Sequence, residues 1–136
     1  MNKIEGGCLC GEVRYSGEAE PMMVVVCHCT DCQKHSGGAC SINVLLPRDV
    51  LQFEGQLNTY IGKGDSGHDV NRKFCGNCGS AIYNLPALMQ DIFVLKAGTL
   101  DDVSWLEPTV EIYCDSAQEW AKIAEGVESF PGMMPG

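Results

Sequence analysis

The chain has 136 residues, nine of them cysteine, and a formal net charge of −9 at neutral pH. This length predicts one domain spanning residues 1–136, built around a single hydrophobic core. The acidic balance, with no run of Lys and Arg longer than the pair Arg72–Lys73, argues against nucleic-acid binding, and no apolar run approaches the ~20 residues that cross a membrane.

Short segments rich in β-branched and aromatic residues recur along the chain, separated by Gly, Pro, Asn and Asp. They predict a mainly β fold of small antiparallel sheets. The predicted strands are residues 12–17, 22–28, 40–46, 57–62, 70–75, 80–85, 91–98 and 109–115. Residues 61–70 contain three glycines and are predicted to form a hairpin loop. One short helix is predicted near the C-terminus, at residues 116–126, because Ser116 can cap it, Glu119 follows three residues later and Gly126 can end it.

Nine cysteines in a chain of this length suggest either disulfides or metal ligands. The N-terminal sequence MNKIEGGCLCGEVRY has no apolar segment typical of a secretory signal, so we expect a cytoplasmic protein. In that reducing compartment, closely spaced cysteines are more often metal ligands than disulfide partners.

Two cysteine pairs lie far apart in the sequence. Cys8 and Cys10 form a C-x-C pair, and Cys75 and Cys78 form a C-x-x-C pair, both with glycines beside them for tight turns. Together they supply the four thiolates of a closed tetrahedral zinc site, with zinc–sulfur distances of about 2.3 Å. We therefore expect one structural zinc that joins these two parts of the chain and contributes strongly to folding.

Other interpretations of these pairs are possible. They could be buried free cysteines, or the C-x-x-C pair could be a redox dithiol, although such a pair usually begins a helix and strand-like sequence lies on both sides here. The pattern CGE followed by C-x-x-C also resembles the signature of zinc deaminases. Phe74 stands where that signature has proline, and Cys8 would have no role.

Three further cysteines, Cys27, Cys29 and Cys32, form a C-x-C-x-x-C group across a predicted turn. Three ligands are one short of a closed zinc site, so either another residue completes the site or the fourth position is open. The Cys and His residues that could complete it are Cys40, Cys114, His28, His35 and His68.

No candidate for the fourth ligand stands out. His28 lies between two ligands and would point away from a metal that they share, so we expect it to be solvent-exposed. Cys40 and Cys114 lie in strand-like apolar segments, where we expect them to be part of the core. His35 is either a group that supports the ligands or a plain surface residue. We therefore expect the fourth coordination position of this zinc to be open, which the chemistry of the three thiolates also favours.

Three thiolates would leave a bound zinc with one net negative charge, which weakens it as a Lewis acid. Such a site suits a soft anionic ligand, and a substrate thiol is one. A thiol bound there loses its proton near neutral pH and stays nucleophilic. We therefore expect Cys27, Cys29 and Cys32 to form a catalytic, exchangeable zinc site for the addition of a small thiol to a small electrophile such as an aldehyde.

Four motifs, GGCLCGEVRY, VVVCHCTDCQKHSG, RKFCGNCGSAIY and EPTVEIYCDSAQEW, resemble the glutathione-dependent formaldehyde-activating enzyme family, which includes the centromere protein V domain. The resemblance runs from Gly6 to about Trp120. It implies a compact Mss4-like zinc fold with two zinc sites at the cysteines already described, the second displaceable by glutathione. It also implies a carbon–sulfur lyase activity, the condensation of glutathione with formaldehyde to S-hydroxymethylglutathione.

The chain departs from the family near its last predicted strand, where it has Glu111 in place of the histidine that many members carry. This departure puts the substrate in doubt. Glutathione has two carboxylates, and the cations available to bind them are Arg14, Lys34, Lys63, Arg72 and Lys73. Lys34 directly follows the three-cysteine group and is the predicted contact, whereas Arg72 and Lys73 lie on opposite faces of one strand and cannot both reach one pocket.

A second hypothesis is a zinc-stabilised protein-interaction module without catalysis, because a fold alone does not fix a function. The fourth ligand at the three-cysteine group discriminates between the two, since a protein side chain there would favour the interaction module. We expect the protein to be a monomer or a homodimer.

Overall fold

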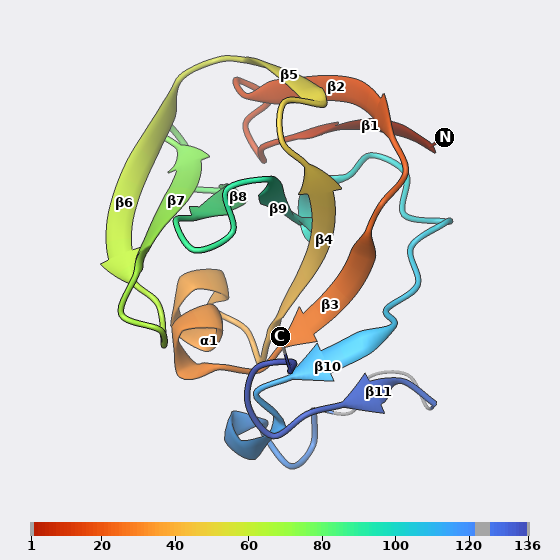
Figure 1. The fold of residues 1–136 in the computed structure, drawn as a ribbon. Coiled ribbons are helices and arrows are strands. Elements are labelled where there is room, and N and C mark those ends of the chain that lie inside the picture. Colours follow the sequence, from red (N-terminus) through yellow and green to blue (C-terminus); the bar gives the residue numbers. More distant parts are fainter. Residues whose placement is uncertain (1, 122–125, 136) are drawn as a thin grey trace.

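The computed structural model describes residues 2–121 and 126–135. Within these residues the chain forms strands, one short α-helix and two 3-10 turns (Figure 1). The elements in chain order are β1 Asn2–Gly7, β2 Arg14–Ala19, β3 Met23–Cys27, α1 Thr30–Ser36, β4 Ser41–Pro47, β5 Leu51–Glu54, β6 Leu57–Lys63, β7 Asp69–Cys75, β8 Ala81–Pro86, β9 Ile92–Lys96, η1 Ala97–Thr99, β10 Val110–Ile112, η2 Cys114–Ser116 and β11 Glu128–Ser129.

The strands form two sheets. Strands β1, β2 and β5 make a three-stranded antiparallel sheet, and the larger sheet has the order β11-β10-β3-β4-β9-β8-β7-β6. Its strands pair antiparallel except that β10 runs parallel to both β3 and β11. The prediction of a mainly β fold is confirmed, although the second sheet is larger than expected and contains parallel pairs. Figure 1 shows α1 at the end of the large sheet where β3 and β10 finish.

The two faces of the large sheet have different surroundings. Alternate residues of a strand point to opposite faces. On one face, Val44 of β4 and Leu95 of β9 are fully buried in a core that they share with Ile4 of the small sheet. On the other face, Asn43 and Lys96 lie directly opposite each other on β4 and β9 and line a pocket near α1. The same two strands therefore build the core and the pocket.

All eight predicted strands correspond to observed ones, namely β2, β3, β4 and β6 to β10. The predicted hairpin loop also lies between two strands, because β6 ends at Lys63 and β7 begins at Asp69. Strands β1, β5 and β11 were not predicted. Strand β1 carries mostly polar or small residues, and β5 and β11 have only four and two residues, so their pairing with neighbours determines their structure more than their own sequence does.

The predicted position of the helix is wrong. Residues 116–121 contain the end of η2 and a turn, and Ala117 is extended; residues 122–125 of the predicted helix lie outside the described residues. The α-helix is Thr30–Ser36 instead, where the sequence suggested a turn. It has seven residues, too few to show helical periodicity, and the Cys29 side chain and left-handed Gly37 cap its ends. None of the described helices is long and apolar enough to span a membrane.

Candidate functional site

The first cysteine cluster joins the two sheets. Cys8 and Cys10 lie in the turn after β1, Cys75 ends β7, and Cys78 lies in the turn that leads to β8. The four sulfur atoms are all within 4.8 Å of one another. The Cys8–Cys10 and Cys10–Cys75 sulfur distances are 3.6 and 3.8 Å. A tetrahedron with zinc–sulfur bonds of about 2.3 Å has edges of about 3.8 Å, so the donor set and its spacing fit zinc.

Amide groups surround these sulfur atoms and favour their thiolate form. The backbone amide of Val13 donates to the sulfur of Cys8 at 3.2 Å, and the side-chain amide of Asn77 donates to that of Cys10 at 3.3 Å. Hydrogen bonds from the Ser80 hydroxyl and amide lower the pKa of Cys78 to about 5. Such contacts hold ligands in place and stabilise their negative charge.

The second cluster lies where β3 meets α1. Cys27 ends β3, Cys29 caps α1 and Cys32 lies in its first turn, and the three sulfur atoms are within 4.8 Å of one another. The amide of Cys32 donates to the sulfur of Cys29 at 3.2 Å. Hydrogen bonds from Cys27 and Cys29 lower the pKa of Cys32 to about 2, and hydrogen bonds with Cys29 and Cys32 together with burial raise the pKa of Cys27. The three grouped sulfur atoms fit a soft metal such as zinc.

Among the described residues, no fourth His, Cys, Asp or Glu atom belongs to the three-cysteine cluster. Cys40 directly precedes β4 and Cys114 begins η2; both are only partly buried, so the expectation that they belong to the core is wrong. Neither Cys40 nor Cys114 lies inside a strand. His35 is half-buried on α1, and His68 is exposed in the β6–β7 loop.

The expectation that His28 is solvent-exposed is also wrong. Its side chain is only 1% exposed, and its Nε2 lies 2.9 Å from Oε1 of Glu111. The two residues come together because β10 lies beside β3, so a side chain that points away from the cysteines meets the neighbouring strand. Glu111, the position at which the sequence departs from the family pattern, is thus the hydrogen-bond partner of His28. The Cys114 sulfur lies within 4.8 Å of the same pair.

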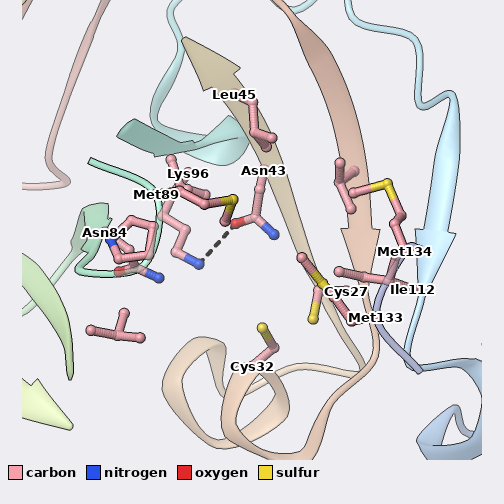
Figure 2. A pocket seen from close by; sticks show the side chains of 14 residues that line it. Cys27, Cys32, Asn43, Leu45, Asn84, Met89, Lys96, Ile112, Met133 and Met134 are labelled. Carbon is pink, nitrogen blue, oxygen red and sulfur yellow. Dashed lines mark hydrogen bonds between the residues drawn. The ribbon is translucent and has the colours of Figure 1, made fainter. Parts of the chain in front are cut away.

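A pocket of about 160 Å³ opens beside the three-cysteine cluster (Figure 2). Cys27 and Cys32 line one end of it. Lys96 lines another part, and its Nζ donates to Oδ1 of Asn43 at 2.9 Å. Asn84 also lines the pocket, and its buried Oδ1 has no hydrogen-bond partner within the described part of the chain. The pocket therefore brings thiols, a cation and an unused acceptor together.

Lys96 is the main functional candidate that sequence reasoning missed. It is 9% exposed, so burial lowers its pKa, and the negative charge of Cys32 and Cys27 opposes part of that shift. The sequence did contain a signal for Lys96, which is a lysine at the end of the apolar run IFVLK. Strand alternation places this lysine on the sheet face opposite Leu95. Its closeness to the cysteines depends on how β4, β9 and α1 pack, which the sequence does not reveal.

Of the five cations considered for glutathione, Lys34, Lys63 and Arg72 line hollows near α1, whereas Arg14 pairs with Asp101 and Lys73 donates to Thr59. Cys29 and Arg72 line a separate, more polar hollow, and Arg72 also lines a neighbouring hollow with Lys34 and His35. The Arg72 side chain is only 12% exposed, and its Nη2 is 3.9 Å from a carboxylate oxygen of Asp31. Lys34 is exposed and does not line the pocket of Cys27.

The mainly β fold and the two cysteine clusters together define a protein that can hold metal at two sites, one of them beside a pocket. The chain belongs to the glutathione-dependent formaldehyde-activating enzyme family, whose sequence pattern matches residues 3–116. The resemblance inferred from the motifs is thereby confirmed.

Two individual proteins are also similar to the chain. A protein of Schizosaccharomyces pombe, named an uncharacterized lyase, is 29% identical over 83 residues, which are 61% of this chain. The match spans 58% of the length of that yeast relative. A crystal structure of a Rhodobacter sphaeroides protein superposes with a TM-score of 0.59 at 18% identity, covering 76% of this chain and 96% of that one. This second likeness concerns the fold alone.

Proposed function

We propose that this protein is a zinc-dependent lyase that makes and breaks the bond between the sulfur of a small thiol and the carbon of an aldehyde. The observation that carries the proposal is the pocket in which Cys27 and Cys32 lie near buried Lys96. The name of the family supports glutathione and formaldehyde as reactants, and the name of the yeast relative supports a lyase. We place the reaction in the carbon–sulfur lyase class.

A zinc ion held by Cys27, Cys29 and Cys32 would bind the thiol sulfur in its remaining position and keep it deprotonated near neutral pH. Within the described residues no further His, Cys, Asp or Glu side chain joins that cluster, which supports catalysis over a purely structural role. As the sulfur–carbon bond forms, the carbonyl π bond breaks and its oxygen gains negative charge. Overall, the proton of the thiol is transferred to that oxygen.

Lys96 can stabilise this oxygen. Its ammonium group has three donors, of which Asn43 accepts one, so others remain to donate to a carbonyl oxygen in the pocket. A cation fixed in advance in a poorly hydrated pocket stabilises developing charge more strongly than water does. The hydrogen bond to Asn43 fixes the position of the ammonium group before the substrate binds.

The rest of the thiol would extend into the polar hollow that Cys29 lines. Glutathione is polar and carries two carboxylates, which suit the hollow that Cys29 shares with Arg72 better than the pocket of Cys27. Lys34 remains the predicted contact, and Arg72 is a second one on the same side.

The test is the rate at which labelled formaldehyde exchanges between its free form and its glutathione adduct at equilibrium, measured by NMR with the zinc-loaded protein. Equilibrium exchange is the right observable because the adduct also forms without a catalyst. We expect the wild-type protein to accelerate exchange and Cys32→Ser to abolish the acceleration. Cys40→Ser is the matched control, because Cys40 belongs to neither the four-cysteine cluster nor the three-cysteine cluster. Exchange no faster than in buffer, or unchanged in Cys32→Ser, would refute the proposal.

A further inference from the structure

Building on the proposed function, we propose that the pocket beside Cys27 and Cys32 binds an apolar group of the aldehyde, and that the preferred electrophile is an aldehyde with about four to six carbons rather than formaldehyde. The reaction would be the same: the sulfur bonds to the carbonyl carbon, the carbonyl π bond breaks, and the proton of the thiol is transferred to oxygen. What differs is that the carbonyl carbon carries a substituent, which the pocket holds.

Four neighbouring strands contribute apolar side chains to the pocket, and Val70 of β7 and Pro86 of β8 extend its wall. In sheet order β10, β3, β4 and β9 contribute Ile112, Val25, Leu45 and Val94. These residues lie on the face of the sheet opposite the core that contains Val44 and Leu95. A sheet face that only meets water is usually polar. Four apolar side chains on adjacent strands therefore form a continuous surface that suits an apolar ligand.

The size of the pocket excludes formaldehyde as the molecule that fills it. An apolar cavity of about 150 Å³ holds a benzene molecule, and this pocket has about 160 Å³. Formaldehyde has one carbon and would leave most of the apolar wall in contact with water. A substituent of four to six carbons would cover that wall and gain the free energy of its burial.

The thiol does not suit the pocket either. Lys96 is the one cation among the described residues that line it, and one cation is too few for the two carboxylates of glutathione. The carboxylates of glutathione would lose their hydration there with little in return. The polar hollow of Cys29 is a separate one, and it offers Arg72 and Lys63 beside Asp31 and Asp65. Cys27 and Cys32 thus line an apolar pocket that suits the electrophile, and Cys29 lines a polar hollow that suits the thiol.

Three methionines complete the apolar side. Met89 comes from the β8–β9 connection, and Met133 and Met134 come from the C-terminal segment, beyond the residues that match the family. Backbone hydrogen bonds hold this segment against the sheet, from the amide of Tyr113 to the carbonyl of Gly132 at 2.9 Å and from that of Cys114 to Phe130 at 3.0 Å. Methionine side chains adapt to different apolar shapes. Part of the specificity therefore comes from a segment outside the family pattern.

The experiment compares two unreactive probes, S-methylglutathione and S-hexylglutathione, by calorimetric titration of the zinc-loaded protein. Each buried methylene should tighten binding about fourfold. We expect the hexyl probe to bind at least tenfold more tightly than the methyl probe. Leu45→Asn places a polar group in the wall and should reduce this ratio below about threefold. Leu88→Asn is the matched control, because Leu88 is 60% exposed and does not line the pocket; it should keep the wild-type ratio.

A second arm measures exchange rates with glutathione for acetaldehyde, butanal and hexanal, whose carbonyl groups have similar reactivity. The acceleration should rise with chain length in the wild-type protein and in Leu88→Asn, but not in Leu45→Asn. Equal affinities of the two probes, together with formaldehyde exchange that depends on Cys32, would overturn this inference and leave the proposed function standing. If neither probe binds and no aldehyde exchanges faster than in buffer, both are overturned.

Discussion

Replacing one cysteine of each cluster by serine should lower stability by very different amounts. Cys75 is fully buried and its sulfur accepts hydrogen bonds from the amides of Asn77 and Cys78, at the point where β7 meets the turn after β1. Cys29 is partly exposed and caps α1 through a hydrogen bond from the amide of Cys32. The two changes remove the same atom from differently built sites.

The expected magnitudes follow from these surroundings. A structural zinc contributes about 10–16 kcal/mol in zinc-finger peptides, whereas the whole free energy of unfolding of a domain is about 5–15 kcal/mol. Cys75→Ser should therefore leave the protein largely unfolded. Serine is itself a preferred helix N-cap, so Cys29→Ser keeps the cap of α1 and should cost no more than about 1 kcal/mol, a few degrees in Tm.

The assay is zinc content together with thermal unfolding followed by circular dichroism, for both variants and the wild-type protein. Cys29→Ser should lose one zinc of two and all catalysed exchange while keeping a cooperative transition. The reasoning is refuted if Cys29→Ser unfolds as badly as Cys75→Ser, because the three-cysteine cluster would then be structural and the interaction-module hypothesis would replace a catalytic one. A folded Cys75→Ser protein with two bound zincs would refute the assignment of the structural site.

Three further predictions concern point substitutions. Lys96→Met should lower the rate of catalysed exchange by roughly 10²–10³, measured by NMR, and change Tm by only a few degrees, because the burial of Lys96 already disfavours its charge. Lys34→Gln should raise the KM for glutathione several-fold, and Arg72→Gln should raise it more because Arg72 is less exposed. If the KM of each variant equals that of the wild-type protein, neither residue binds the thiol. Gly55→Ala should lower the free energy of unfolding by more than about 1 kcal/mol in urea titrations, since Gly55 has φ 93° and an added Cβ would lie 2.1 Å from the carbonyl oxygen of Glu12.

The cysteine clusters could be predicted because their members are neighbours in the sequence. In each pair or trio the spacing alone places the sulfur atoms close together, and the structure groups Cys8 and Cys10 with Cys75 and Cys78 as expected. Strand alternation was equally visible, which is why eight of the strands were predicted. Local patterns of this kind do not depend on how distant segments pack.

The pocket could not be predicted, because it depends on pairing between distant strands. Lys96 faces Asn43 only through the register of β4 and β9. His28 was expected to be exposed because its burial requires β10 and Glu111 beside β3. The helix at Thr30–Ser36 is capped by a residue, Cys29, that sequence reasoning treated only as a ligand. Each of these errors concerns a contact that becomes visible only after the chain has folded.

The sheet face that carries the pocket departs from the ordinary pattern, in which an antiparallel sheet has one apolar face and one that meets water. Leu45 and Val94 make this face apolar, yet Lys96 is buried on it as well. A buried lysine with only uncharged partners is disfavoured by several kcal/mol unless it gives up its proton. Here the negative charge of Cys32 and Cys27 offsets part of that cost, so the lysine and the cysteines depend on one another. The burial of Lys96 beside the three-cysteine cluster is therefore better explained by a chemical role than by a contribution to stability.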